Sequence, residues 1–218
     1  MDLTAIVSDM WAGYTQLQGT HPVIGSILTA EVIFPFSDAL SQAITDQKVD
    51  WKKVRYTAAL ASIYGAVAYA QQQSGELVGK YVYDHPLAKA VLGPNLWGNV
   101  VNMFFFMNNT VGERNEYRLD GLVEHYRSLI DNPKQEMSWL ENVTEKVWGN
   151  VPTKEYLNAV IGTLTFWNVF QYFNYSYVEE AMRTPASIVV SVGWMTLMSL
   201  WSLNGRRRIV DEIGRAHV

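Results

Sequence analysis

The chain has 218 residues, a formal net charge of −4 at neutral pH and no cysteine. The lack of cysteine excludes disulfides, thiolate metal sites and cysteine nucleophiles, and the acidic balance offers nucleic acid no basic surface. Charged residues make up 17% of the sequence, below the roughly 25% of soluble domains.

Residues 1–21 contain no Lys or Arg, so they resemble neither a secretory signal nor a mitochondrial transit peptide. Ile6, Met10, Trp11 and Tyr14 can share one helical face. We therefore expect an N-terminal interfacial segment, with a short helix lying at a membrane surface.

Five stretches are long enough to cross a bilayer, which takes about 20 mostly apolar residues in a helix. The first contains only two charged residues, and the other four contain none. They are residues 22–45, 56–75, 90–112, 156–178 and 184–205. The sequence predicts an all-α fold, a polytopic membrane helix bundle of about five spans plus amphipathic surface helices. A soluble helix bundle is the alternative.

In the first span, Glu31, Asp38 and Gln42 are spaced seven and four residues apart and line one stripe. A charge near the bilayer centre costs about 2.5–3.5 kcal/mol, so Asp38 should face protein or water. Two interpretations stay open. Asp38 is either a buried carboxylate bonded to Asn, Gln, Trp or Tyr of other helices, or part of a proton or ion site.

The second span carries small residues at four-residue spacing, which favour close helix packing: Ala58, Ser62, Ala66 and Ala70. Its end, Gln71-Gln72-Gln73, is expected to lead into polar surroundings. The third span is predicted as one helix over 87–107, in which Asn95, Asn99 and Asn102 form a polar stripe.

Residues 113–155 form a hydrophilic connection with charges of both signs and amphipathic patterning. It is either a solvated loop domain or a docking surface for another protein, with Trp139 and Trp148 as candidate contacts.

In the fourth span, Trp167, Gln171 and Asn174 share one helical face. An amide in hydrocarbon must find a partner inside the protein. These residues therefore either join helices or line a polar path. Arg183 and Pro185 are expected to interrupt the apolar run before the fifth span, which carries Trp194 and leads to a basic tail, 206–218.

The basic residues support five spans in one membrane domain, 1–218. With the first connection, the third connection and the C-terminus on one side, that side holds 14 of the 17 Lys and Arg. Such asymmetry is typical of multi-span membrane proteins. The N-terminus is then on the less basic side.

Two groups of residues resemble the Mpv17/PMP22 family of small organelle membrane proteins. Near the C-terminus the matches are Trp167, Gln171, Asn174, Tyr175, Val178, Arg183, Trp194 and Ser199, and near the N-terminus they are Tyr14, His21, Pro22, Asp38, Ser41 and Gln42. The family prolines after Trp167 and Val178 are replaced by Asn168 and Glu179.

The resemblance implies a protein of the mitochondrial inner membrane or, alternatively, of the peroxisomal membrane. No catalytic sequence motif is present, and the four histidines lie outside the apolar spans. We therefore expect no enzyme activity, no metal and no cofactor.

Two functions remain. The first is an accessory or scaffold subunit of a larger membrane assembly, such as the respiratory chain or ATP synthase. The alternative is a pore or small-solute channel built around Asp38, Gln42, Gln171 and Asn174. The first is favoured unless the second and third spans present polar faces to a continuous central cavity. Membrane lipids and other membrane subunits are the expected partners.

Overall fold

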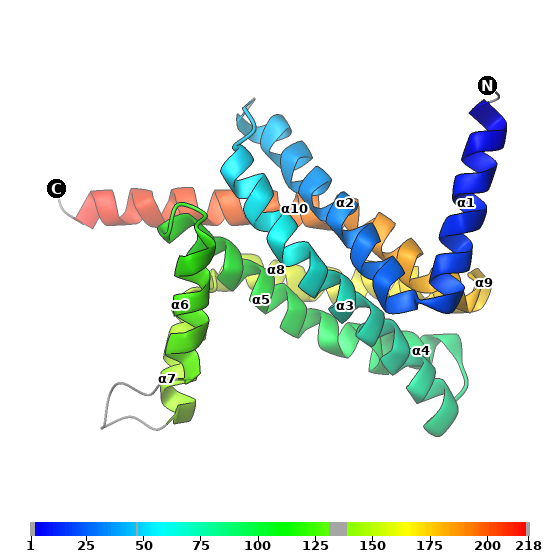
Figure 1. The fold of residues 1–218 in the computed structure, drawn as a ribbon. Coiled ribbons are helices and arrows are strands. Elements are labelled where there is room, and N and C mark those ends of the chain that lie inside the picture. The colour runs from blue at the N-terminus through cyan, green and yellow to red at the C-terminus, as the bar shows by residue number, and fades with distance from the viewer. Residues whose placement is uncertain (1–2, 47, 131–138, 217–218) are drawn as a thin grey trace.

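The structure is a computed structural model that describes residues 3–46, 48–130 and 139–216, and these residues are almost entirely helical (Figure 1). The elements in chain order are α1 (Leu3–Thr20), α2 (Pro22–Asp46), α3 (Trp51–Tyr81), α4 (Pro86–Leu92), α5 (Pro94–Arg114), α6 (Leu119–Ile130), α7 (Trp139–Trp148), α8 (Thr153–Gly162), the π-helical turn η1 (Thr163–Trp167), α9 (Asn168–Tyr177) and α10 (Glu180–Ala216). The predicted all-α class is confirmed.

Helices α2 and α3 form a tightly packed pair, and α10 packs against α2 (Figure 1). A Cβ atom on Gly65 of α3 would lie 2.7 Å from the Ile27 Cα atom of α2, so the two backbones nearly touch there. Ala61, one turn earlier, is completely buried. The predicted close packing is present, centred on Ala61 and Gly65, while Ala70 at the end of the predicted small-residue ridge is exposed.

Helix α3 is longer than predicted. The expectation that the chain leaves the bundle for polar surroundings at Gln71-Gln72-Gln73 is therefore wrong. The helix continues to Tyr81, and the Gln72 side chain is buried in the bundle. Three polar residues in a row cannot reveal from sequence that one of them points inward.

The predicted third helix is divided into α4 and α5 at Gly93. Pro94 begins α5, where its missing N–H donor costs nothing. A Cβ atom on Gly93 would lie 2.5 Å from the Gly75 Cα atom of α3, so only glycine permits this contact. The break thus lets the chain change direction where α4 meets α3.

Helices α8, η1 and α9 follow one another without a break from Thr153 to Tyr177. The chain then turns at Val178, which has extended backbone, and α10 begins at Glu180. Arg183 and Pro185 lie inside the first turns of α10, so the predicted interruption occurs about five residues earlier.

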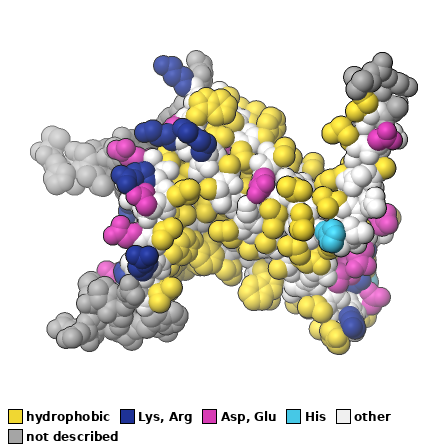
Figure 2. All heavy atoms as spheres, viewed as in Figure 1, with side chains coloured by type: hydrophobic (Ala, Val, Ile, Leu, Met, Phe, Trp, Pro, Cys, Tyr) yellow, Lys and Arg dark blue, Asp and Glu magenta, His cyan; other side chains and the backbone are white. Residues whose placement is uncertain are grey.

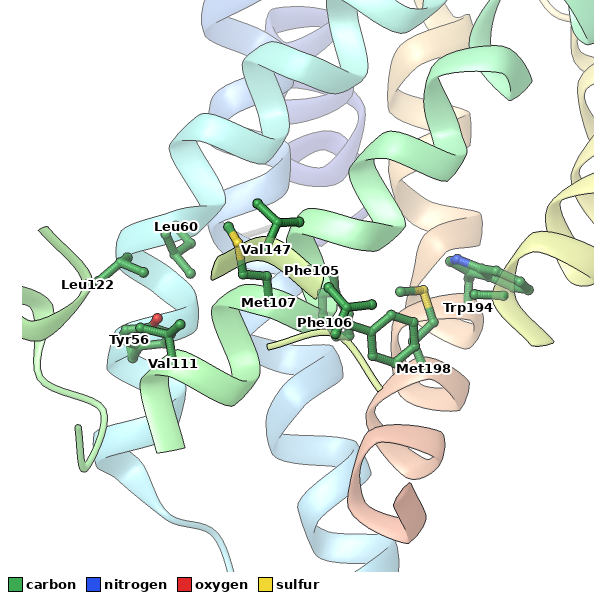
Figure 3. Close-up of a cluster of buried hydrophobic side chains, with 12 residues drawn as sticks. Tyr56, Leu60, Phe105, Phe106, Met107, Val111, Leu122, Val147, Trp194 and Met198 are labelled. Carbon is green, nitrogen blue, oxygen red and sulfur yellow. The ribbon is translucent and has the colours of Figure 1, made fainter. Parts of the chain in front are cut away.

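Most of the apolar core lies between α3, α5, α6, α8 and α10. Figure 3 shows Trp194 and Met198 of α10 near Phe106 of α5, and Leu122 of α6 beside Leu60 of α3. Phe106 is fully buried and Met198 nearly so. This core fixes the positions of the helices that enclose the polar site.

Apolar side chains also cover much of the outside. Figure 2 shows a broad yellow area across the middle of the molecule, with charged side chains gathered at its left and right margins. Within the described ranges, one helix, Pro22–Thr45, is long and apolar enough by composition to cross a membrane, with a mean hydropathy of 1.5.

Candidate functional site

A cavity of about 110 Å³ lies at the centre of the bundle, between α3, α5, η1, α9 and α10. None of the described residues that line it is charged. Its polar lining consists of amides and hydroxyls, from Gln71, Gln72, Asn95, Asn102, Thr163, Gln171, Ser187 and Ser191. The rest of the lining is mostly apolar and includes Phe105, Ile188 and Met198. A space of this size with these polar groups in its wall can hold several water molecules or one small polar solute.

The amides at one wall converge on Ser187 of α10 and form what we call the Ser187 cluster: Gln72, Gln171, Asn174 and Ser187. The side-chain N–H groups of Gln72, Gln171 and Asn174 donate to the Ser187 Oγ atom at 2.7, 3.1 and 3.1 Å. The Ser187 hydroxyl in turn donates to the Arg183 carbonyl at 2.9 Å. The cluster joins α3, α9 and α10.

Two hydrogen-bond acceptors of the Ser187 cluster have no donor among the described residues. The Gln72 Oε1 and Asn174 Oδ1 atoms are buried and have no hydrogen-bond partner among the described residues. A buried unpaired polar group costs about 1–3 kcal/mol, and this cost falls when a water or a solute donates to it. Of these two residues, Gln72 lines the cavity and can offer its acceptor to a guest there, while Asn174 lies beside it.

A second polar contact joins α5 to the π-helical turn. The Asn102 Nδ2 atom donates to the Thr163 Oγ1 atom at 2.9 Å, and the Trp194 Nε1 atom donates to the Asn102 Oδ1 atom at 3.4 Å. The Asn95 amide donates to the Asn168 Oδ1 atom. Asn168 replaces a family proline, and its side chain supplies this link. Single π-helical turns are frequent at functional sites.

Charged residues gather about one turn beyond the Ser187 cluster, at the ends of α3 and α10. The Arg183 guanidinium pairs with the Glu76 carboxylate and lies over the Tyr175 ring, 5.3 Å from its centroid. Lys89 pairs with Glu76 at 3.5 Å and with Asp84 at 2.8 Å. The hydrogen bond from Lys89 lowers the pKa of Asp84 and raises the pKa of Lys89. These charged residues do not line the polar cavity.

Asp38 lies elsewhere, on the opposite half of the α2–α3 pair. Its carboxylate pairs with the Lys53 ammonium at 3.0 Å, and both side chains are only 6% exposed. The Gln42 Nε2 atom donates to the Asp38 Oδ2 atom at 2.9 Å, and the Gln42 Oε1 atom accepts from the Asp50 N–H at 2.6 Å. The buried-carboxylate interpretation is supported, but its cationic partner was not among the expected Asn, Gln, Trp or Tyr.

The predicted pore residues are thus divided between two places. Gln171 lines the cavity with Trp167 and Trp194, and Asn174 lies beside it in the Ser187 cluster. Asp38 and Gln42 do not line it. Glu31, on the same predicted stripe, is exposed and accepts a hydrogen bond from Ser62 at 2.6 Å.

The candidate docking residues lie on α7. The Trp148 side chain is 47% exposed and its ring lies edge-on to Tyr156, with a centroid distance of 5.7 Å. Trp139 begins α7, and its side chain lies outside the described part of the structure.

Sequence reasoning missed Ser187, Gln72 and Lys53 as site residues. Serine on an apolar helix gives no signal by itself, and Lys53 counted only toward membrane orientation. The asparagine stripe of the third span was the available indication, because Asn95 and Asn102 both reach the cavity.

Comparison with known proteins gives one match. No curated protein and no solved structure matches the chain. Residues 139–199, which include α8, η1, α9 and the cavity-lining part of α10, match the model described as the Mpv17 / PMP22 family. This match confirms the resemblance predicted from the motifs: over this segment the chain is similar to the Mpv17 / PMP22 family.

Proposed function

We propose that this small membrane protein provides a pathway for small polar solutes across the mitochondrial inner membrane, through the central cavity and without catalysis. The peroxisomal membrane is the alternative location. The observation that carries the proposal is the lining of the cavity by amides and hydroxyls from α3, α5, α9 and α10. Buried polar groups at membrane depth are costly and usually mark a pathway or a packing contact.

The sequence alone favoured an accessory subunit, on the condition that the second and third spans held no polar face toward a cavity. Gln71 and Gln72 of α3 and Asn95 and Asn102 of α5 line the cavity. These polar faces support the pathway hypothesis over the accessory subunit.

Five membrane spans accompany the proposal: α2, α3, α5, α8 to α9, and α10. Each carries large apolar side chains on the outside, among them Val32, Ile63, Leu96, Phe173 and Val189, all more than half exposed. Such residues in continuous patches are rare on soluble monomers. The charged side chains within these spans that are buried, such as Asp38 and Lys53, are paired.

The proposal is tested by solute flux into proteoliposomes and by current in planar bilayers. Gln72→Leu removes an amide from the cavity wall at nearly constant volume and is expected to reduce transport strongly. Gln73→Leu is the matched control, because Gln73 is the next residue in the chain and its side chain does not line the cavity. The pathway would be rejected if vesicles with the wild-type protein showed no more solute flux than empty vesicles, or if the two variants transported equally.

The accessory-subunit hypothesis keeps one supporting observation. Helices α6 and α7 project from one end of the bundle (Figure 1), and Trp148 of α7 presents a half-exposed ring. Exposed aromatic rings are common anchors of protein interfaces. If this hypothesis holds, native electrophoresis in mild detergent will show the chain in a larger assembly, and Trp148→Ala will release it.

A further inference from the structure

A second, larger cavity opens on the outside of the bundle as a groove between α3, α5 and α6. Its volume is about 880 Å³, within the ~300–1,000 Å³ of pockets that hold drug-sized ligands. Its lining is mostly apolar and includes Ile63 and Val67 of α3, Trp97, Val100 and Phe104 of α5, and Val123 of α6. We call it the lateral groove.

The lateral groove is separate from the polar cavity but shares a wall with it. Tyr64, Gln71 and Val101 line both spaces. On the outer side, Ile63, Trp97 and Val123 are 60%, 53% and 57% exposed. In a bilayer these side chains would face hydrocarbon, so the groove is open to lipid tails rather than to water.

The α6 end of the lateral groove carries exposed charges of both signs: Arg118 and Arg127, with Asp120 and Glu124. Helix α6 runs crosswise to the ends of α3 and α5 (Figure 1), and Figure 2 shows Lys and Arg side chains, interspersed with Asp and Glu, over this margin next to yellow ones. Amphipathic helices of this kind lie in the membrane interface. Arg127 follows Val123 by one helical turn and so shares its face.

Arg127 is the cation best placed to act at the groove. It is exposed, and no ion pair joins it to another described residue. The other arginine at this margin, Arg118, is already paired with Asp120. An unpaired cation beside an apolar groove complements a ligand with a hydrocarbon chain and an anionic head.

We propose that the lateral groove binds an acyl chain of an anionic phospholipid, and that Arg127 binds the phosphate of its headgroup. The site is independent of transport through the polar cavity and requires only that the chain lie in a bilayer. One Lys or Arg near an anionic surface contributes about 1 kcal/mol, which is about fivefold in affinity. Arg127 therefore sets the preference for anionic lipid, while the groove provides the chain contacts.

The test uses the full chain in nanodiscs that contain phosphatidylcholine with or without phosphatidylglycerol. After exchange into mild detergent, native mass spectrometry counts the lipids retained on each protein. Wild type is expected to retain phosphatidylglycerol in preference to phosphatidylcholine. Arg127→Gln should lower that preference about fivefold. Ala70→Phe, which places a ring in the groove, should reduce retention of both lipids.

Lys80→Gln is the matched control, since Lys80 is an exposed cation at the other end of α3 and does not line the groove. It should leave the preference unchanged. The proposal is overturned if Lys80→Gln acts as strongly as Arg127→Gln, if wild type retains both lipids equally, or if Ala70→Phe retains as much lipid as wild type. A dimer whose formation Ala70→Phe abolishes, without retained lipid, would assign the groove to a second copy instead.

Discussion

Ser187 shows how much of the buried polarity depends on a single hydroxyl. Its Oγ atom accepts from three amides, and the Gln72 Nε2 atom makes no other hydrogen bond among the described residues. By contrast, Asn174 also donates to the Gln171 Oε1 atom and the Arg183 carbonyl. The contact between α3 and α10 at this level is therefore the one most sensitive to loss of the hydroxyl.

Ser187→Ala should lower the free energy of unfolding by about 1–3 kcal/mol, because the Gln72 donor is left buried and unpaired. Unfolding in mild detergent, followed by tryptophan fluorescence, measures the change. Ser191→Ala is the control, since Ser191 also lines the cavity but, among the described residues, bonds only to the Ile188 carbonyl of its own helix. Equal losses in the two variants would contradict the role of Ser187.

The Asp38–Lys53 pair leads to a second prediction at the residue scale. Asp38→Asn leaves the buried Lys53 ammonium unpaired, and breaking a buried pair in this way costs about 3–5 kcal/mol. Asp38→Leu combined with Lys53→Met removes both charges and should recover most of the stability. Thermal unfolding of the three proteins in detergent compares them. If the double variant is no more stable than Asp38→Asn, the prediction is wrong, and the pair contributes stability beyond the compensation of two buried charges.

His125 of α6 predicts a pH dependence. Burial lowers the pKa of His125, and the nearby charges of Lys146 and Arg114 lower it further. The unfolded chain, with a His pKa of about 6.5, therefore takes up a proton more readily than the folded one. The stability that the folded state gains from a neutral His125 is present above the unfolded pKa. It is lost as the pH falls through the lower pKa of the folded state.

His125→Gln should flatten this part of the pH profile of the unfolding temperature. The measurement is a series of thermal unfolding curves in detergent across mildly acidic and neutral pH. A profile that stays as steep in the variant as in wild type would assign the dependence to another group.

At the scale of elements, three glycines decide how closely helices approach at two contacts. A Cβ atom on Gly162, the last residue of α8, would lie 2.3 Å from the Trp194 ring of α10. Gly93 and Gly75 form the equivalent contact between α4 and α3. An added Cβ atom would displace an aromatic ring or a backbone segment, and so move a helix, because packed interiors leave little free space.

Gly162→Ala should therefore destabilise the bundle by about 1–3 kcal/mol through overpacking. Gly193→Ala, in the middle of α10 with nothing near its added Cβ atom, should instead stabilise it by up to ~1 kcal/mol through helix propensity. Unfolding midpoints of the two variants, measured side by side, should move in opposite directions. A shift in the same direction would contradict the close packing of α8 on α10.

For the whole molecule, the proposed five spans place the two ends of α3 on opposite sides of the membrane. Lys52 and Lys80 are both exposed, near the beginning and end of that helix. Because the chain contains no cysteine, Lys52→Cys and Lys80→Cys each introduce a single thiol.

In sealed, uniformly oriented vesicles, a membrane-impermeant maleimide should label one of these two variants and reach the other only after detergent is added. Labelling of both before detergent would exclude α3 as a span. Labelling of both, together with release of the chain by carbonate, would exclude the membrane bundle as a whole.

The sequence by itself determined the helical class, the place of the apolar helices and the inward faces of Gln171, Asn174 and Asp38. Helical periodicity is local, so residues three or four apart must share a face whatever packs against them. The same argument correctly identified the asparagines of α5 as a stripe, two of which reach the cavity. It also carried the family resemblance, because the motif residues lie at fixed local spacings.

Only the tertiary structure decided which partners these residues meet. Gln72 and Ser187 are 115 positions apart, and their contact depends on how α3 and α10 are docked, which no local pattern encodes. The pairing of Asp38 with Lys53, the division of the third helix at Gly93 and the lateral groove arise in the same way. Each depends on the distance between helices, and that distance is set by small residues and core volume acting together across the whole bundle.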